Sequence, residues 1–599
     1  MKIIYSVNAK KILRFISRDK RKSCFSILSD DLMGIGIFLK SRGMKELNIS
    51  LSDDERILCE KEYLATIDKL SLEQNSLNWW ANPISEKNEH IGTHYKNICR
   101  FYSFAKIVKR CADDDIFVVC GPMLLGQLKE YCHDNDIVFL SLEKGAILWA
   151  AALKRSLDNM LKICLSLGSS MANTIYASYM LRPRLANRIK GDNHYVIRTW
   201  LDQRFLAESK SYKDAYFGKL ADHVVKRGYK PLVLAGVVSK YRDVVRKSLR
   251  DDSSLIVPEE YFLRLTDFLL LALYFIRTKI KRVTLDGVDL TFLYAQEINK
   301  RYFSPEYFRN ILKYFIARRL AKMVDFKVYI QTYENYAWEK LSILGIREIN
   351  QDAEIFGFQH AFVSRNSFKY FPGKNERDMM PAPDRVITMG LKTKEILENY
   401  GNYKTGVLRV GCALRQDYLA DAKVISRRKL NRIMVPLTMV HNESVSILRF
   451  LADANINLDT EVLVRCHPAA PLDLFKKYID FNIPHNFVFY NDEDAQTALS
   501  KIDMMFYTWT TLALEALKVG LPVIYLDILD PMYVDPLFMC SALKRVVKSS
   551  DQLTSVINNL YNMEDEPFYL EQKQAQEYLK DYFYPMTENN LDAFYPTAN

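Results

Sequence analysis

The chain has 599 residues, 49% hydrophobic and 26% charged, which is the composition of a globular protein long enough for two or more domains. Its ten cysteines include no CxxC pair, so neither a zinc site nor a disulfide framework is indicated, and reduced thiols in a cytosolic protein are expected. The net charge of +11 suits a phosphorylated substrate or an anionic membrane, and no nucleic-acid-binding motif is present.

The first 360 residues alternate strand-like with helix-like runs, after an opening, MKIIYSVNAKKILRF, whose apolar run is interrupted too early for a signal peptide. Residues 115–142 predict a strand, a helix and a strand, and the helical stretch 145–190 then resembles an insertion. The sequence then predicts a strand at 194–200, a helix ending at Gly228 and a strand at 230–236. Later it predicts a strand at 326–335, a helix that ends at Gly345 and a strand at 353–360.

The apolar stretch LTDFLLLALYFI, 265–276, is too short to span a membrane and contains Asp267, so it predicts a buried helix. The basic run RTKIKR, 277–282, follows it directly. That run leaves open a helix lying on an anionic membrane surface. The sequence does not decide whether 145–190 or 265–282 contacts a membrane.

A second series begins after residue 380. Its predicted strands are 384–390, 405–411, 431–438, 460–468, 503–509 and 521–527, and its helices are 391–401 (capped by Gly401), 443–453 and 510–520. Strands that alternate with helices form parallel sheets covered by helices on both faces. Two such series predict an α/β protein with two Rossmann-like domains facing a cleft, joined in the polar, proline-containing stretch 371–384.

Polar residues follow many of these predicted strands, and ligands of open parallel sheets bind beyond the carboxyl ends of the strands. Gln359 and His360 hold such a position in FGFQH, and Glu334 and Asn335 hold it after the strand at 326. In the second series the corresponding residues are Thr438, His467, Thr508 and Thr510.

His467 and Pro468 end the strand VLVRCHP. Proline fixes a turn, and an imidazole beside it can bind a phosphate or a hydroxyl. The structural alternative is a histidine satisfied by a neighbouring backbone group.

A threonine cluster, Thr508, Thr510 and Thr511, stands where a strand becomes a helix, and Glu515 follows one turn later. Hydroxyls and free N–H groups at a helix start form an anion site, and Glu515 can reach a ribose or sugar hydroxyl. The alternative is ordinary capping by Thr510 or Thr511 with a solvated glutamate.

Glu334 is the candidate general base, with His360 as the second candidate. The alternative is that Glu334 or Glu339 caps or pairs on the following helix. Three further residues, Arg198, Asp214 and Arg415, complete the group of candidates for the acceptor or the cleft. Arg198 is placed to bind an acceptor anion. For Asp214 the alternative is helix capping or strand-end pairing, and for Arg415 it is an exposed structural role.

The chain has no GxGxxG after a strand, Walker loop, GxSxG elbow, HExxH or clearly placed DxD pair. We therefore expect no bound metal and no cofactor.

Two α/β series, His467-Pro468, and a threonine cluster with a downstream Glu-Ala and GLPVI resemble a GT-B glycosyltransferase. Bacterial sialyl-, polysialyl- and Kdo transferases of this fold have a similar His-Pro and Ser/Thr motif that holds a CMP-sugar; here threonine replaces the usual serine and Trp509 stands among the threonines. The segments YVIRTW, YKDAYFGKL, YENYAWEK, FGFQH, MPAPDRVITMG and VGCALRQDYL are similar to surface-carbohydrate biosynthesis proteins of bacterial O-antigen clusters.

This resemblance implies a cytoplasmic enzyme, peripheral at the inner face of the cytoplasmic membrane, that builds a bacterial lipopolysaccharide O-antigen or capsule. Residues 1–378 are the implied acceptor-side domain, with the insertion at about 145–190. Residues 379–570 are the implied nucleotide-sugar domain, and 571–599 a tail whose helix crosses back to the first domain. The implied donor is a CMP-activated acidic sugar, with UDP-sugars left open, and the implied acceptor is a glycan or lipid-linked glycan.

The same scaffold also suits a CDP-polyol phosphotransferase or a nucleotide-sugar 2-epimerase. A non-catalytic polysaccharide-assembly protein that binds glycan or lipid is an alternative of another class.

Overall fold

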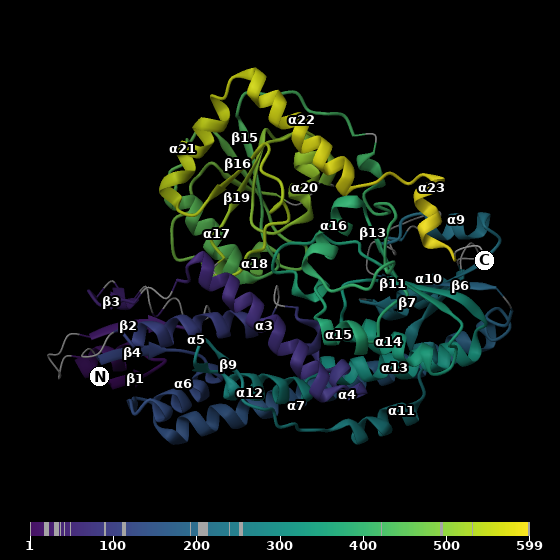
Figure 1. Ribbon diagram of the computed structural model, residues 1–599, viewed down its shortest axis with the longest axis horizontal. Helices are drawn as coiled ribbons and strands as arrows, with labels where there is room; N and C mark the ends of the chain where they lie inside the picture. The colour runs from purple at the N-terminus through teal and green to yellow at the C-terminus, as the bar shows by residue number, and fades with distance from the viewer. Residues whose placement is uncertain are drawn as a thin grey trace. The chain divides into compact units, whose positions relative to one another are not determined.

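The computed structural model describes most of the chain. The described residues are 2–16, 23–28, 35, 38–40, 42–47, 50–88, 92–110, 115–191, 193–201, 214–238, 240–250, 255–420, 422–490, 495–529 and 531–596. They divide into two compact units (Figure 1). Unit 1 comprises 1–215, 221–355 and 372–384, and unit 2 comprises 216–220, 356–371 and 385–599.

The first part of unit 1 forms a five-stranded parallel sheet in the order β3-β2-β4-β1-β5. Its strands are β1 (Lys2–Tyr5), β2 (Ser23–Ile27), β3 (Lys45–Glu46), β4 (Asp115–Val119) and β5 (Val138–Ser141). Buried Ile4, Phe25 and Phe117 form its core. With α6 (Pro122–Asp134) between β4 and β5, the strand, helix and strand predicted at 115–142 are confirmed.

The second part of unit 1 contains four parallel strands in the order β11-β6-β7-β8. They are β6 (His194–Leu201), β7 (Lys230–Val237), β8 (Leu255–Pro258) and β11 (Phe326–Thr332). The strands predicted at 194, 230 and 326 are thereby confirmed. Most side chains of β6, β7 and β11 are buried, as expected for strands covered on both faces.

Gly345 does not end its helix, contrary to the prediction. The helix α14 (Ala337–Arg347) continues for two residues beyond it. A Cβ atom at position 345 would lie 2.6 Å from the carbonyl oxygen of Tyr314, in the neighbouring α13 (Pro305–Met323). Glycine therefore serves here to let two helices approach closely.

The predicted insertion is a single long helix, α7 (Gly145–Leu185), while the prediction of a buried helix at 265–276 is wrong. That segment is a short surface helix, α11 (Leu265–Leu270), continued by η4 (Leu271–Tyr274). Its buried side is anchored by Asp267, which accepts two hydrogen bonds, at 2.8 and 2.9 Å, from the guanidinium of Arg319. Because this carboxylate faces the protein, the leucines face outward, with Leu269 75% exposed. Within the described parts of the chain, no helix is long and apolar enough to cross a membrane.

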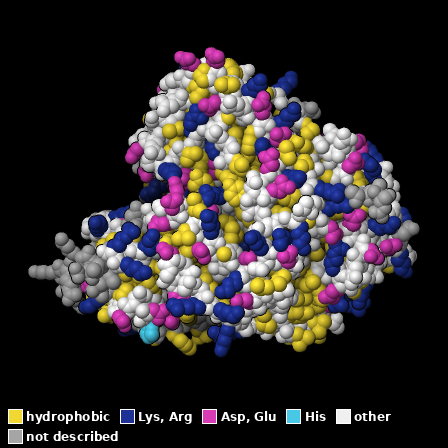
Figure 2. Space-filling view, viewed as in Figure 1, with side chains coloured by type: hydrophobic (Ala, Val, Ile, Leu, Met, Phe, Trp, Pro, Cys, Tyr) yellow, Lys and Arg dark blue, Asp and Glu magenta, His cyan; other side chains and the backbone are white. Residues whose placement is uncertain are grey.

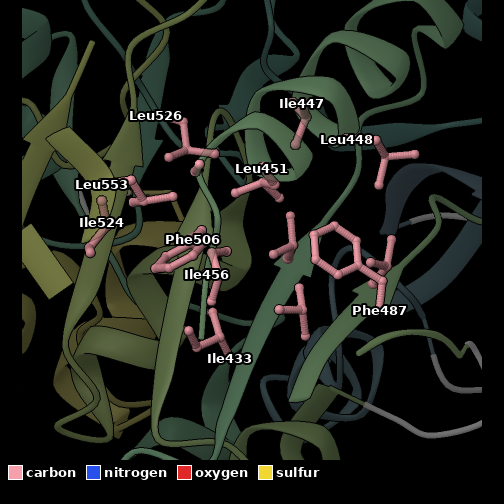
Figure 3. Close-up of a cluster of buried hydrophobic side chains, with 14 of the residues drawn as sticks. Ile433, Ile447, Leu448, Leu451, Ile456, Phe487, Phe506, Ile524, Leu526 and Leu553 are labelled. Atoms are coloured by element: carbon pink, nitrogen blue, oxygen red, sulfur yellow. The ribbon is translucent and has the colours of Figure 1, made fainter. Parts of the chain in front are cut away.

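Unit 2 is built on a six-stranded parallel sheet in the order β17-β16-β15-β18-β19-β20. Its strands are β15 (Arg432–Pro436), β16 (Glu461–Arg465), β17 (Phe487–Phe489), β18 (Met504–Tyr507), β19 (Val523–Leu526) and β20 (Lys544–Val547). Figure 3 shows one core, where Leu451 of α17 (His441–Asp453) faces Phe506, Ile524 and Leu526 of the sheet. The strands predicted from 431 to 527 are confirmed.

Unit 2 also contains three short parallel strands, β12 (Glu354–Phe358), β13 (Arg385–Thr388) and β14 (Leu408–Val410), the first of which begins at the unit boundary. The helix α16 (Leu391–Tyr400) ends at Gly401 as predicted. The helix predicted from 571 begins earlier, as α22 (Asp565–Tyr582), and packs on α16 and α20 (Thr511–Lys518) of the same unit. The α/β fold with Rossmann-like parallel sheets is confirmed.

Candidate active site

The sheet of unit 2 has a topological switch point between β15 and β18. Numbered along the chain, its strands run 3-2-1-4-5-6, so the chain winds in one direction from β15 and in the other from β18. Ligands of such sheets bind in the crevice beyond the carboxyl ends of the two strands at the switch. Thr438 follows β15 and Thr508 follows β18, so the fold brings these two predicted residues to the switch point.

Thr508 is buried, with 1% of its surface exposed, and its Oγ1 has no hydrogen-bond partner among the described residues. A buried hydroxyl without a partner costs about 1–3 kcal/mol of stability. The folded chain therefore leaves a polar atom after β18 unsatisfied, and this atom is enclosed by the protein.

The helix α20 begins three residues after Thr508, at Thr511, and takes its cap from Thr510, whose hydroxyl accepts the N–H of Leu512 at 3.2 Å. The capping alternative thus describes Thr510, while Thr511 is the first helical residue and is half-buried. The indole of Trp509 donates a hydrogen bond of 2.9 Å to Glu443 of α17. This bond ties the segment after β18 to the helix that follows β15.

His467 is half-buried beyond β16, the strand next to β15. Its Nδ1 accepts the N–H of Ala469 at 3.1 Å, and its carbonyl oxygen accepts the N–H of Ala470. Burial lowers the pKa of the ring below 6.5, so the imidazole is neutral near pH 7. Because Nδ1 is the acceptor, the proton lies on Nε2, which can donate to an anion. Pro468 is exposed.

Glu515 lies on α20 inside a polar cluster. The hydroxyl of Tyr418 donates to its Oε2 at 2.6 Å. Burial raises the pKa of Glu515, against the opposite effects of the Tyr418 hydrogen bond and of Arg415 and Arg465. The structure thus brings the predicted Glu515 and Arg415 together, and adds Tyr418 and Arg465 to them.

Thr438 forms a local turn, since its hydroxyl accepts the N–H of Val440 at 3.1 Å. Its backbone carbonyl accepts the hydroxyl of Ser444 at 3.0 Å, which fixes the start of α17. Thr438 therefore fixes the turn between β15 and α17 through both its hydroxyl and its backbone carbonyl.

The candidate base Glu334 lies in unit 1, half-buried in the turn after β11, beside the buried Asn335, which has a φ of 59°. Both carboxylate oxygens of Glu339 accept the N–H of Glu334, and one of them also accepts that of Tyr336. Burial and the charge of Glu334 raise the pKa of Glu339 to about 8, against these hydrogen bonds. Glu339 therefore fills the capping role that was the alternative for this pair.

Arg198 on β6 is fully buried between the rings of Trp200 and Trp338, with its guanidinium carbon 3.7 Å from each ring centroid. Its Nε and Nη2 donate to Glu259 at 3.1 and 3.4 Å, and Lys313 also pairs with that carboxylate. Burial would raise the pKa of Glu259, but the two cations lower it to about 2. The charge of Arg198 is thus matched inside unit 1.

The remaining candidates hold the ends of strands. Asp214 is buried and accepts the hydroxyl of Thr199 on β6 at 3.0 Å. Gln359, at the end of β12, is fully buried, donates to the carbonyl of Ala361 and accepts the N–H of Met389 at 3.4 Å. His360 is buried and stacks edge-on with Tyr216, at 5.1 Å between ring centroids.

Sequence reasoning missed Tyr418, Arg465 and Glu443. Arg465 ends the strand that carries His467, so its position was readable from the pattern that identified the histidine. Tyr418 and Glu443 come from other segments and meet the site only in the folded chain. Among the described residues, no group of three or more His, Cys, Asp or Glu is arranged to hold a metal ion.

No known protein family profile matches the chain, and no curated protein matches it. Several solved structures do. The calicheamicin glycosyltransferase CalG4 is 10% identical, with 65% of this chain and 94% of that chain covered and a TM-score of 0.37. MurG of Acinetobacter baumannii is 11% identical, with 64% of this chain and 95% of that chain covered and a TM-score of 0.36. UDP-GlcNAc 2-epimerase of Neisseria meningitidis bound to UDP-GlcNAc is 10% identical, with 67% of this chain and 98% of that chain covered and a TM-score of 0.40. Likeness at this level leaves the activity undecided.

Proposed function

We propose that this protein is a glycosyltransferase that moves a sugar from a nucleotide-activated donor to a growing bacterial surface glycan. The observation that carries the proposal is the buried hydroxyl of Thr508, which has no partner among the described residues, at the switch point of a parallel sheet and three residues before the start of α20. The first N–H groups of a helix and a hydroxyl beside them suit a phosphate.

The proposed donor site uses the edge of the unit 2 sheet. Thr508, Thr511 and the start of α20 hold the donor phosphate, with the cap Thr510 fixing that start, and Nε2–H of His467 donates to a second phosphate oxygen. Thr438 and Pro468 shape the turns beside them, and Glu515 accepts a hydroxyl of the ribose or sugar. Arg415 and Arg465 add positive charge as the phosphate leaves. The transfer is proposed to need no resident metal and no cofactor.

In the proposed reaction, an acceptor hydroxyl attacks the anomeric carbon of the donor sugar. The new C–O bond forms as the bond from that carbon to the phosphate oxygen breaks, and the nucleotide leaves with the electron pair. Glu334 takes the proton of the acceptor hydroxyl, with His360 as the second candidate for this role. The proposed donor is a CMP-activated acidic sugar, and the proposed acceptor is a lipid-linked glycan at the inner face of the cytoplasmic membrane.

Of the residues predicted to bind acceptor, Asn335 remains in the proposal because it adjoins Glu334. Arg198, Asp214 and Gln359 are given supporting roles, since each is buried in contacts with its own unit. In the proposal, residues 1–378 bind the acceptor and residues 379–570 bind the donor.

The test is nucleotide binding followed by product analysis. We expect CMP to raise the melting temperature of the purified protein more than CDP, UDP, GDP or dTDP, because a ligand that binds only the folded state stabilises it. His467→Ala should abolish the shift. His485→Ala is the matched control, since His485 is an exposed histidine of the same unit in the segment before β17.

Products then separate the candidate activities. Glycan extension that is lost in Glu334→Gln and His467→Ala supports the transferase. Release of CMP from a CDP-polyol, or interconversion of nucleotide sugars, would replace it with a phosphotransferase or an epimerase. A shift with UDP in place of CMP would replace the donor. Absence of any nucleotide binding would indicate a non-catalytic assembly protein.

A further inference from the structure

The outward face of α7 is apolar. Four leucines, Leu153, Leu157, Leu161 and Leu165, follow one another at intervals of four residues and are exposed by 44%, 56%, 58% and 65%. Residues four apart lie on one side of a helix, so these leucines form a stripe. Trp149 before them is 68% exposed and Ile175 after them is 53% exposed.

The other side of α7 already has its core contacts. Ile163, Ala177, Leu181 and Leu185 are buried, and the helix packs on α13 and on η3 (Glu259–Phe262). The exposed stripe is therefore not the core-facing side of the helix. A contiguous exposed apolar patch on a folded protein marks an interaction surface.

The short helix α11 and η4 extend this patch. Leu265, Leu269, Leu273 and Phe275 are exposed by 50%, 75%, 74% and 53%. Asn159 of α7 donates a hydrogen bond to the carbonyl of Phe303, whose ring lies 5.7 Å from that of Phe275. The two segments are thus neighbours in unit 1, and Figure 2 shows apolar side chains gathered over α11. We call these exposed apolar residues of α7, α11 and η4, with Phe275, the α7–α11 surface.

The charged residues that α7 contributes beside the α7–α11 surface are mostly positive. The helix α7 carries five basic residues, Lys154, Arg155, Lys162, Arg182 and Arg184, and a single acidic one, Asp158. Four exposed basic residues follow η4, namely Arg277, Lys279, Lys281 and Arg282, of which Lys281 pairs with Glu73 at 2.9 Å and Arg282 with Asp289 at 2.7 Å. A second copy seated on this surface would bring like charges together, whereas an anionic bilayer satisfies both the apolar stripe and the basic flanks.

We infer that the α7–α11 surface docks on an anionic phospholipid bilayer, with α7 lying in the plane of the interface. The apolar stripe enters the boundary between headgroups and acyl chains, and the lysines and arginines contact lipid phosphates. This inference goes beyond the transferase and does not rest on it, since binding to lipid requires none of the residues of the sheet edge in unit 2.

The test is flotation of the full chain with vesicles of phosphatidylcholine alone or of phosphatidylcholine with phosphatidylglycerol. We expect binding to the anionic vesicles that weakens as salt is raised. The double substitution Leu157→Glu with Leu161→Glu should weaken it on the order of a hundredfold or more. Lys154→Ala and Lys162→Ala should each weaken it about fivefold.

Matched controls come from exposed residues of unit 2. Leu458→Glu with Leu474→Glu changes two leucines of similar exposure, 57% and 49%, and Lys423→Ala changes an exposed lysine. These variants should float as the unchanged protein does, and thermal unfolding confirms that each is folded. The inference is overturned if neither vesicle binds, or if the α7 and control variants float equally. It is also overturned if the protein is a dimer that Leu157→Glu with Leu161→Glu converts to a monomer, since a second copy then covers the stripe.

Discussion

The two units bury polar side chains of their sheets and use them differently. In unit 1, Arg198, inside β6, is enclosed by two tryptophans and neutralised by Glu259, although its Nη1 has no hydrogen-bond partner among the described residues. In unit 2, Thr508 at the end of β18 is equally buried, yet its hydroxyl has no partner among the described residues. A buried polar residue on a sheet therefore does not by itself identify a ligand site, and the additional observation beside Thr508 is the switch point of the unit 2 sheet.

The test with the largest expected effect compares the free energy of unfolding of two variants, each with one buried glutamate changed to glutamine. Glu259→Gln should lower the free energy of unfolding by about 3–5 kcal/mol, because it leaves Arg198 and Lys313 without their buried carboxylate. Glu515→Gln should lower it by less than about 1 kcal/mol, because burial already favours the neutral form of Glu515. Urea unfolding measures both. Equal losses would show that Glu515 and Glu259 both stabilise the protein through their negative charge.

A second test concerns how the stability of unit 1 depends on pH through the buried Glu339. The pKa of Glu339 is raised from 4.5 to about 8 in the folded protein. The folded state therefore holds an extra proton between these two values, and stability through this group falls as pH rises across that window, by at most about 1.4 kcal/mol per pH unit. Glu339→Gln, which cannot ionise, should flatten the slope of unfolding free energy between pH 5 and pH 8 by roughly this amount. If the slope is unchanged in the variant, the pH dependence of stability comes from other ionisable groups.

A third test compares two buried threonines. Thr199→Val removes the hydrogen bond to the buried Asp214 and should cost about 1–3 kcal/mol. Thr508→Val removes a hydroxyl without a partner, so stability should be unchanged or slightly higher, while nucleotide binding is lost. Thermal unfolding with and without CMP measures both effects. A destabilised Thr508→Val would mean that this hydroxyl has a structural role.

The smallest expected effect separates capping from binding at α20. Thr510→Ala should cost about 1 kcal/mol, because the Thr510 hydroxyl accepts the N–H of Leu512. Thr511→Ala, at the first helical residue, should cost a few tenths of a kcal/mol and act mainly on nucleotide affinity. The midpoints of urea unfolding and the dissociation constant for CMP distinguish the two. Similar losses of stability would place both hydroxyls in the cap.

The alternation of strands and helices was readable from the sequence because buried parallel strands and amphipathic helices leave distinct local patterns. Thr508 and His467 were found in this way, since Thr508 directly follows β18 and His467 lies two residues beyond β16. The partners of Arg198 were not, because Glu259 and Lys313 come from distant segments whose approach depends on packing. The prediction for 265–276 is wrong for a related reason: in the sequence Asp267 argues against a membrane span and so favours a buried helix, whereas in the structure it faces the protein, bonded to Arg319, and the leucines face outward.

The strand order of unit 2 has a consequence for how the candidate site comes into existence during folding. Ile433 of β15 pairs with Met504 of β18, and the chain between them contains β16, β17 and their helices. Contacts between residues so distant in sequence form slowly, because a long loop must be closed before the pairing stabilises it. The switch point therefore depends on the most distant pairing between adjacent strands of this sheet. A refolding chain should gain its helices early and become able to bind a nucleotide only in its slowest phase.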